Sequence, residues 1–207
     1  MNKRTMKKGL AIVLALMMVF SMSTFAFANT TITPQPVTYP VNVDVTIFAE
    51  EGNVTDVTGT SQTVNDVYVE DSITFTAPFT TVFTQYLSPN PGSAHQLSGY
   101  PTVMDAICKA YQNAGGTAAN ITLGWDSNPS EGPQGAYISK LFGNSTITTV
   151  SGFYRWEGYS WVIYLNDTTK TWNEATRTGK IPYYASNVQI QSGDKVFVLF
   201  EQTEETW

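Results

Sequence analysis

His95 is the residue around which an acid–base mechanism would have to be built, because the chain contains a single histidine. Possible hydroxyl and carboxylate partners for a catalytic triad are Ser93, Ser98, Asp105 and Asp126. However, the chain lacks the G-x-S-x-G turn that exposes a nucleophilic serine, and His95 lies in a segment rich in proline and glycine, residues 88–101. We therefore interpret His95 as a surface-loop residue and predict no catalytic residues. Glycoside hydrolysis by a pair of carboxylates stays open as an alternative, because the distance between two carboxyl groups in the fold cannot be obtained from the sequence.

A metal site is the second kind of chemistry to consider. Residues 126–132 place oxygen-bearing side chains at positions 1, 3 and 5 of a possible calcium loop, but position 6 is Glu131 instead of Gly and position 12 is Tyr137 instead of Glu. An Asx-rich turn explains this segment better. The single cysteine excludes an intramolecular disulfide and a cysteine-based zinc site. We predict that no metal is bound and that Cys108, beside the apolar face of a predicted helix, is a buried and inert thiol.

Aromatic side chains are the most suggestive group, because they make up 13% of the residues while charged side chains make up only 14%. Aromatic surfaces suit sugars, corrin rings and protein partners alike, although they also build the cores of β-proteins. We predict that Trp161 belongs to the core and that the aromatic residues flanking a turn at Gly158 contact a ligand. These predicted ligand-binding residues are Tyr154, Trp156 and Tyr159.

The elements that would position these residues are mostly strands. Apolar and polar residues alternate over residues 41–47, which predicts a half-buried strand. Residues 50–62 are rich in turn-forming residues. One helix is predicted over 102–114, with Thr102 and Asp105 as a capping box and a Gly-Gly stop. Further strands are predicted at 64–69, 73–87, 121–125, 136–142, 146–153, 160–165 and 195–201. This combination predicts an α+β fold that is mostly β.

The first 28 residues have the features of a secretory signal peptide. A basic head is followed by eleven apolar residues and by an Ala-Phe-Ala site that predicts cleavage after Ala28. Eleven apolar residues are too few to span a hydrocarbon core of about 30 Å. We expect a Pro/Thr-rich extended leader over 29–40 and a single domain over 41–207. The net charge of −6 becomes more negative when the basic head is removed, which argues against a nucleic-acid partner.

Four sequence blocks follow one another in an order that resembles the transcobalamin C-terminal-like domain of exported bacterial proteins. They are PTVMDAI at 101–107, AYISKLFG at 136–143, GYSWVIYLN at 158–166 and SGDKVFV at 192–198. The resemblance implies a β-grasp-like sheet with one helix packed across it, and an extra β insertion at about 50–100 before the helix. The third block ends Asn-Asp where the family usually has Asn-Gly. In animal cobalamin carriers this domain closes over the corrin opposite a helical barrel, for which this chain has no room.

These observations predict a secreted, non-catalytic binding or interaction module at a bacterial cell surface, without a cofactor and without a membrane span in the mature chain. The expected ligand is an extracellular protein, a glycan or a corrinoid. Two alternatives stay open, namely a small secreted hydrolase and a surface protein that assembles through exposed strand edges. A hydrolase should have a cleft with a strongly perturbed acid, and an assembling protein should have an unprotected edge.

Overall fold

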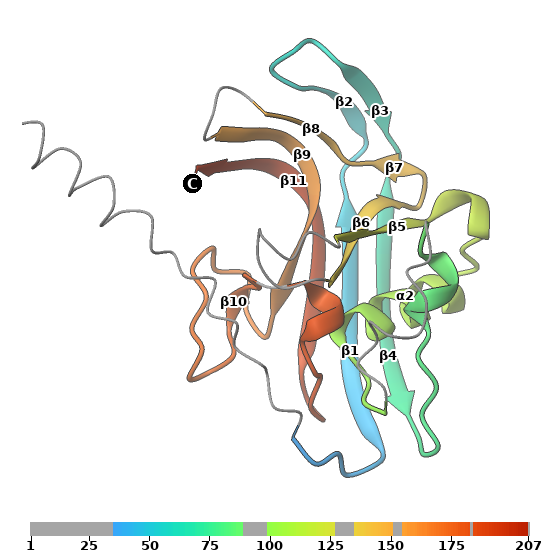
Figure 1. The fold of residues 1–207 in the computed structure, drawn as a ribbon. Coiled ribbons are helices and arrows are strands. Elements are labelled where there is room, and N and C mark those ends of the chain that lie inside the picture. Colours follow the sequence, from blue (N-terminus) through green and yellow to red (C-terminus); the bar gives the residue numbers. More distant parts are fainter. Residues whose placement is uncertain (1–34, 89–98, 127–134, 151–154, 183, 207) are drawn as a thin grey trace, which may run out of the picture.

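The computed structural model describes residues 35–88, 99–126, 135–150, 155–182 and 184–206. Its largest element is a curled sheet with the strand order β10–β9–β11–β1–β4, to which β8 adds by pairing with β9 (Figure 1). The strands β1 and β11 at its centre are parallel, and the neighbouring pairs are antiparallel. The strands are β1 (Val41–Ala49), β4 (Val67–Phe75), β8 (Ile147–Val150), β9 (Arg155–Leu165), β10 (Gly179–Lys180) and β11 (Lys195–Thr206).

The alternation that predicted the first strand is confirmed. The odd-numbered side chains of β1, from Val41 to Ala49, are at most 3% exposed, and they face the interior of the domain. On the neighbouring strand β4, Val67, Ile73 and Phe75 are buried on the same side. Because successive side chains of a strand point to opposite faces, the even-numbered side chains of both strands must point outward.

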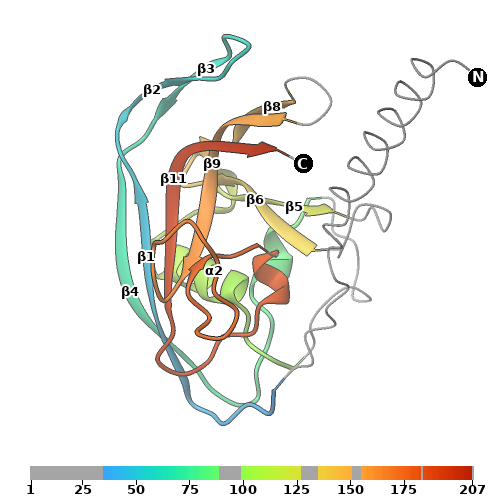
Figure 2. The same cartoon turned by 90° about the vertical axis from the view of Figure 1, so that its left-hand side faces the viewer.

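The helix α2 (Val103–Asn113) lies across the inner side of this sheet (Figure 2). It begins with the predicted capping box, in which the Thr102 hydroxyl accepts from the Asp105 N–H while the Asp105 carboxylate accepts from the Thr102 N–H. It ends before Gly115, whose φ of 77° is open to glycine at little cost. The predicted helix is thus confirmed to within a residue at either end.

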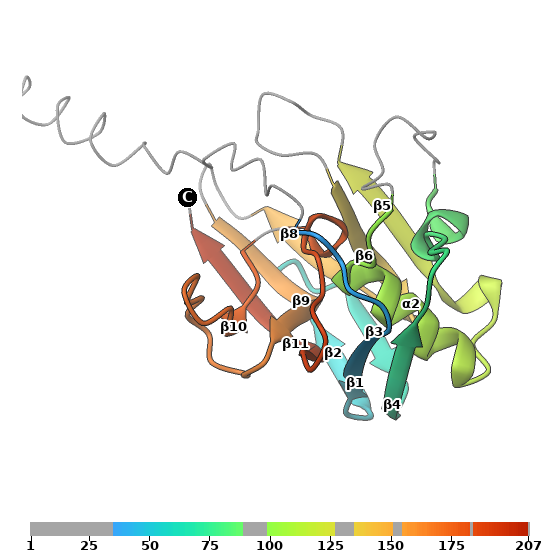
Figure 3. The same ribbon diagram turned by 90° about the horizontal axis from the view of Figure 1, so that it is seen from below.

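A second, three-stranded sheet lies on the same side of the main sheet as α2 (Figure 3). It contains β5 (Thr122–Asp126), β6 (Gly135–Leu141) and β7 (Asn144–Ser145). Short 3₁₀ turns connect these layers, namely η1 (Phe83–Tyr86), η3 (Ala118–Asn120) and η4 (Ala185–Asn187). The core therefore lies between the inner face of the main sheet and a layer formed by α2 and the small sheet.

The segment 50–62, predicted as turns, instead forms most of a hairpin. The strands β2 (Gly52–Thr55) and β3 (Ser61–Val64) extend the β1–β4 pair outward, which is visible at the top of Figure 1. The turn between them is built on Asp56, whose carboxylate accepts from the backbone N–H groups of Thr58 and Thr60. A ribbon that faces solvent can be formed by threonine and asparagine without an apolar face. The alternation of apolar and polar residues that predicts a strand is therefore missing from this part of the sequence.

The middle of the chain also differs from the prediction. One unbroken strand, β4, occupies much of the region predicted as two strands over 64–69 and 73–87, and a 3₁₀ turn follows it. Of the strand predicted at 146–153, β8 covers Ile147–Val150, and residues 151–153 lie outside the described residues. The strand β9 already includes Arg155, whereas the prediction began at residue 160. Over the described residues the fold is mostly β with one α-helix.

Candidate ligand-binding face

The outer face of the sheet consists of the even-numbered residues of β1 and β4, from Asn42 to Phe48 and from Tyr68 to Thr74. All of these side chains are exposed except that of Thr46, which is half-buried. Figure 2 shows β1 and β4 along one side of the molecule, with α2 on the opposite side of them. The outer face is therefore a solvent-facing surface on two paired strands.

Two aromatic residues lie next to each other on this face. Phe48 of β1 is directly opposite Tyr68 of β4, and Leu199 of β11 is directly opposite Phe48 on the other side. We call Tyr68, Phe48 and Leu199 the aromatic row. Tyr68 is 66% exposed and Phe48 is 41% exposed, whereas Val162, which continues the row on β9, is only 5% exposed. The open part of the row thus lies on β1 and β4.

Large exposed apolar side chains are uncommon in the described residues, where they occur at Phe48, Val57, Tyr68 and Tyr137. Isolated cases are ordinary, since every protein surface contains some apolar atoms. Tyr137 is such a case, because its ring lies against Gly124 of the neighbouring strand. Phe48 and Tyr68 differ because they are cross-strand neighbours, and contiguous exposed apolar area is a mark of interaction sites.

The rest of the outer face is polar and internally ordered. The Ser72 hydroxyl donates to Asp44 Oδ1 at 2.7 Å, and the Thr74 hydroxyl donates to Asn42 Oδ1 at 2.9 Å. We call these two cross-strand pairs the polar rows. They hold their side chains in fixed positions, which lowers the entropy cost of binding a ligand there.

Glu70 joins the aromatic row to the polar rows. The Tyr68 hydroxyl donates to Glu70 Oε2 at 3.0 Å, so the carboxylate fixes the orientation of the tyrosine ring. This hydrogen bond, together with the negative charge of Glu70, raises the pKa of Tyr68 above its usual value. The tyrosine is therefore neutral at physiological pH and acts as a hydrogen-bond donor.

The β9 side of the sheet is occupied by protein contacts. The Tyr164 hydroxyl donates to Glu201 Oε1 at 2.5 Å, and Lys170 Nζ lies 3.7 Å from the same oxygen. Burial, followed by the hydrogen bond to Glu201, raises the pKa of Tyr164 far above its usual value.

Of the three residues predicted from sequence as the binding site, Tyr159 is the one whose side chain the structure describes. Tyr154 lies outside the described residues, and the side chain of Trp156 is not described, although its backbone pairs with Val150 and Glu205. Tyr159 is half-buried and stacks on Phe200 with ring centroids 6.3 Å apart. It lies on the inner side of the sheet with Trp161, whose Nε1 donates to Asn144 O and whose predicted place in the core is confirmed.

The prediction of a turn at Gly158 is wrong. The strand β9 runs unbroken through this glycine, and a side chain there would collide with the backbone of Ile147 on β8. Glycine is needed at this position because the backbone of the neighbouring strand approaches too closely to leave room for a side chain.

The other chemically capable residues do not form a site in the described part of the chain. His95 and residues 127–132 of the calcium-like segment lie outside it, while Asp126 accepts a hydrogen bond from Tyr184. No group of three or more metal-ligating side chains occurs among the described residues. Cys108 is fully buried, and burial raises its thiol pKa well above the usual value, as expected for an inert thiol.

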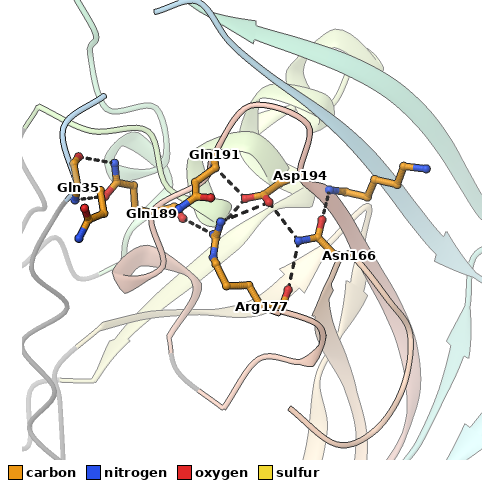
Figure 4. A network of polar contacts seen from close by, with 7 residues as sticks. Gln35, Asn166, Arg177, Gln189, Gln191 and Asp194 are labelled. Atoms are coloured by element: carbon orange, nitrogen blue, oxygen red, sulfur yellow. Dashed lines mark hydrogen bonds and ion pairs between the residues drawn. The ribbon is translucent and has the colours of Figure 1, made fainter. Parts of the chain in front are cut away.

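A polar network holds the N-terminal segment to the domain (Figure 4). Arg177 forms an ion pair with Asp194 at 3.0 Å and donates to the backbone oxygen of Gln189. Asn166 Nδ2 donates to Asp194 Oδ1, which ties the segment after β9 to the start of β11. The Gln189 side chain in turn makes two hydrogen bonds with the backbone of Gln35. The network is a structural clasp, and it shows that part of the predicted leader is fixed to the domain.

No protein-family model, curated protein or solved structure matches the chain. The helices of the described residues do not have the length and apolar composition needed to cross a membrane.

Sequence reasoning overlooked the aromatic row, although a signal was present. In the alternating stretch that begins at Val41, the polar positions are Asn42, Asp44 and Thr46, and the next one is Phe48. An aromatic residue at a polar position of an amphipathic strand is the signal to look for. The position of Phe48 opposite Tyr68 depends on strand pairing and could not be predicted from neighbouring residues.

Proposed function

We propose that this protein is a secreted, non-catalytic binding module of the transcobalamin C-terminal-like type, acting at a bacterial cell surface through the outer face of β1 and β4. The observation that carries this proposal is the exposed cross-strand pair Tyr68–Phe48. Aromatic side chains on a rigid sheet form a binding surface with little conformational entropy to lose. A contiguous apolar area that faces water is costly unless it is used.

We also propose that the sheet is of the β-grasp type. The order β9–β11–β1–β4, with its parallel central pair, supports this assignment. The place of α2 in the chain, after the first hairpin and before β9, supports it as well. In this scheme β4 is a strand of the β-grasp sheet itself, and the hairpin β2–β3 is the insertion.

Edge-to-edge assembly is the less favoured alternative because of Asp71. This residue is the central one of β4, the last strand of the sheet, and it lies on the inner side, where it accepts a hydrogen bond from Asn113. Antiparallel pairing of two copies of β4 in full register would place Asp71 opposite Asp71. Like charges directly opposite each other are destabilising, and inward-pointing charges are a known protection of edge strands.

Binding to the cell envelope tests the proposal. The purified mature protein is mixed with insoluble envelope from the producing bacterium, and the co-sedimenting fraction is measured. We expect the wild type to sediment with the envelope and the double variant Tyr68→Ala, Phe48→Ser to bind at least tenfold more weakly. Tyr137→Ala is the matched control, because it removes an exposed aromatic residue elsewhere. Equal sedimentation of the wild type and the double variant, or none by the wild type, would refute the proposal.

A further inference from the structure

We infer that the ligand of the outer face is a neutral glycan, bound by stacking on Tyr68 and Phe48 and by hydrogen bonds to the polar side chains beside them. This inference rests on the proposed binding function and names the class of ligand. Three features of the face carry it: the aromatic row, the ordered polar rows, and the sign of the charges.

The aromatic row provides an apolar platform of the kind that the C–H face of a sugar ring requires. Tyr68 and Phe48 are directly opposite in register on adjacent strands, which lie about 4.8 Å apart. Their side chains therefore start from neighbouring positions on the same face, where one sugar ring can contact both. The Tyr68 hydroxyl, fixed by Glu70, adds a polar group at the rim of this surface.

The polar rows provide the complementary hydrogen-bonding groups. A sugar hydroxyl both donates and accepts, so it is best matched by carboxylate and amide oxygens mixed with hydroxyl groups. Glu70, Asp44 and Asn42 offer such oxygens, and Ser72 and Thr74 offer hydroxyl groups on the same face. Same-face residues recur about every 7 Å along a strand, so the two polar rows follow one another along β1 and β4 at successive same-face positions.

A protein ligand fits this composition less well. The buried centres of protein interfaces are depleted in Glu, Asp and Ser, yet these residue types directly adjoin the aromatic row here. An anionic glycan also fits less well, since Asp44 and Glu70 are both exposed carboxylates. Lys195, opposite Asp44 on β11, balances only one of them. A neutral glycan gains the same stacking and hydrogen bonds without this repulsion.

Competition in the envelope assay tests the inference. The probes are the hexasaccharides of cellulose, xylan, mannan, starch and chitin, with hexagalacturonate as the anionic probe. The assay is repeated on envelope digested with trypsin. We expect binding to survive trypsin and at least one neutral hexasaccharide to compete, with hexagalacturonate at least tenfold weaker.

Variants locate the binding of the competing hexasaccharide, measured directly by calorimetry. Tyr68→Ala should weaken it at least tenfold and Glu70→Ala about threefold or more. Tyr137→Ala and Glu51→Ala are matched controls on other surfaces and should stay within twofold. Loss of envelope binding after trypsin, competition by no neutral hexasaccharide, preference for hexagalacturonate, or unchanged affinity of Tyr68→Ala would each overturn the inference. Envelope binding that requires Tyr68 and Phe48 but is lost after trypsin would leave the proposed binding function standing.

Discussion

Replacing Asp105 with alanine removes a buried carboxylate that accepts four hydrogen bonds at the start of α2. Its Oδ1 accepts from Val82 N at 2.6 Å and Phe83 N at 3.4 Å, while its Oδ2 accepts from the backbone and hydroxyl of Thr102 at 3.0 and 2.6 Å. The carboxylate thus holds the segment before η1 against the N-terminus of the helix. It is fully shielded from solvent, so water cannot replace it.

The size of the effect follows from the donors left behind. The backbone N–H groups of Val82 and Thr102 make the two shorter backbone contacts, and a buried donor without a partner costs about 1–3 kcal/mol. The Thr102 hydroxyl also loses its acceptor, Asp105 Oδ2, which adds about 1 kcal/mol. Removing a charge from the interior offsets part of this, so we expect Asp105→Ala to lose about 3–5 kcal/mol of unfolding free energy. Asp105→Asn keeps one acceptor oxygen and should lose less.

The pH dependence provides an independent check. Burial raises the pKa of Asp105 above its usual value, although the hydrogen bonds from Thr102 and Val82 oppose the shift. A raised folded-state pKa means a contribution to stability that is complete below the ordinary pKa of about 3.9 and is lost as pH rises through the folded-state pKa. The stability difference between wild type and Asp105→Asn should therefore be larger at pH 4 than at pH 7.

The assay is urea unfolding followed by tryptophan fluorescence, for wild type and both variants at the two pH values. An Asp105→Ala variant within 1 kcal/mol of the wild type would show that the four contacts do not stabilise the fold. A stability difference that grows from pH 4 to pH 7 would refute the argument from burial.

Four further outcomes are expected. Trp161→Ala should lose about 3–5 kcal/mol in urea unfolding and Tyr159→Ala, half-buried beside it, about 1–2 kcal/mol; equal losses would contradict the difference in burial. Cys108 should react slowly with thiol reagents in the native state, and Cys108→Ser should cost about 1 kcal/mol or more; fast native labelling would disprove its burial. Asp56 should titrate with a pKa of about 2 by NMR, because hydroxyl groups of threonines donate to its carboxylate. The contribution of Asp56 to stability is therefore present above pH 4 and lost between pH 4 and pH 2. A titration midpoint near pH 4 would disprove this. The exported protein should begin at the residue after Ala28, which its intact mass would show; a secreted mass that includes the first 28 residues would rule out cleavage there.

Local chemistry explains which parts of the fold were predictable. Alternation over β1 and the capping box of α2 are written in neighbouring residues, and both elements formed where the sequence indicated. The hairpin β2–β3 and the course of β9 through Gly158 were missed, because threonine-rich ribbons and glycine within strands look like turns when only neighbours are considered. The burial of Trp161 and Cys108 was predictable from their apolar surroundings in the chain.

The sequence by itself determined that β1 has one apolar face and one polar face interrupted by Phe48. It could not determine what stands opposite Phe48, because strand pairing depends on a register that two distant segments reach together. Only the tertiary structure placed Tyr68, twenty positions later in the chain, beside Phe48 and joined Asp105 to the backbone of Val82. The physical reason is that periodicity is a property of neighbouring residues, whereas a binding face is a property of the contacts between strands.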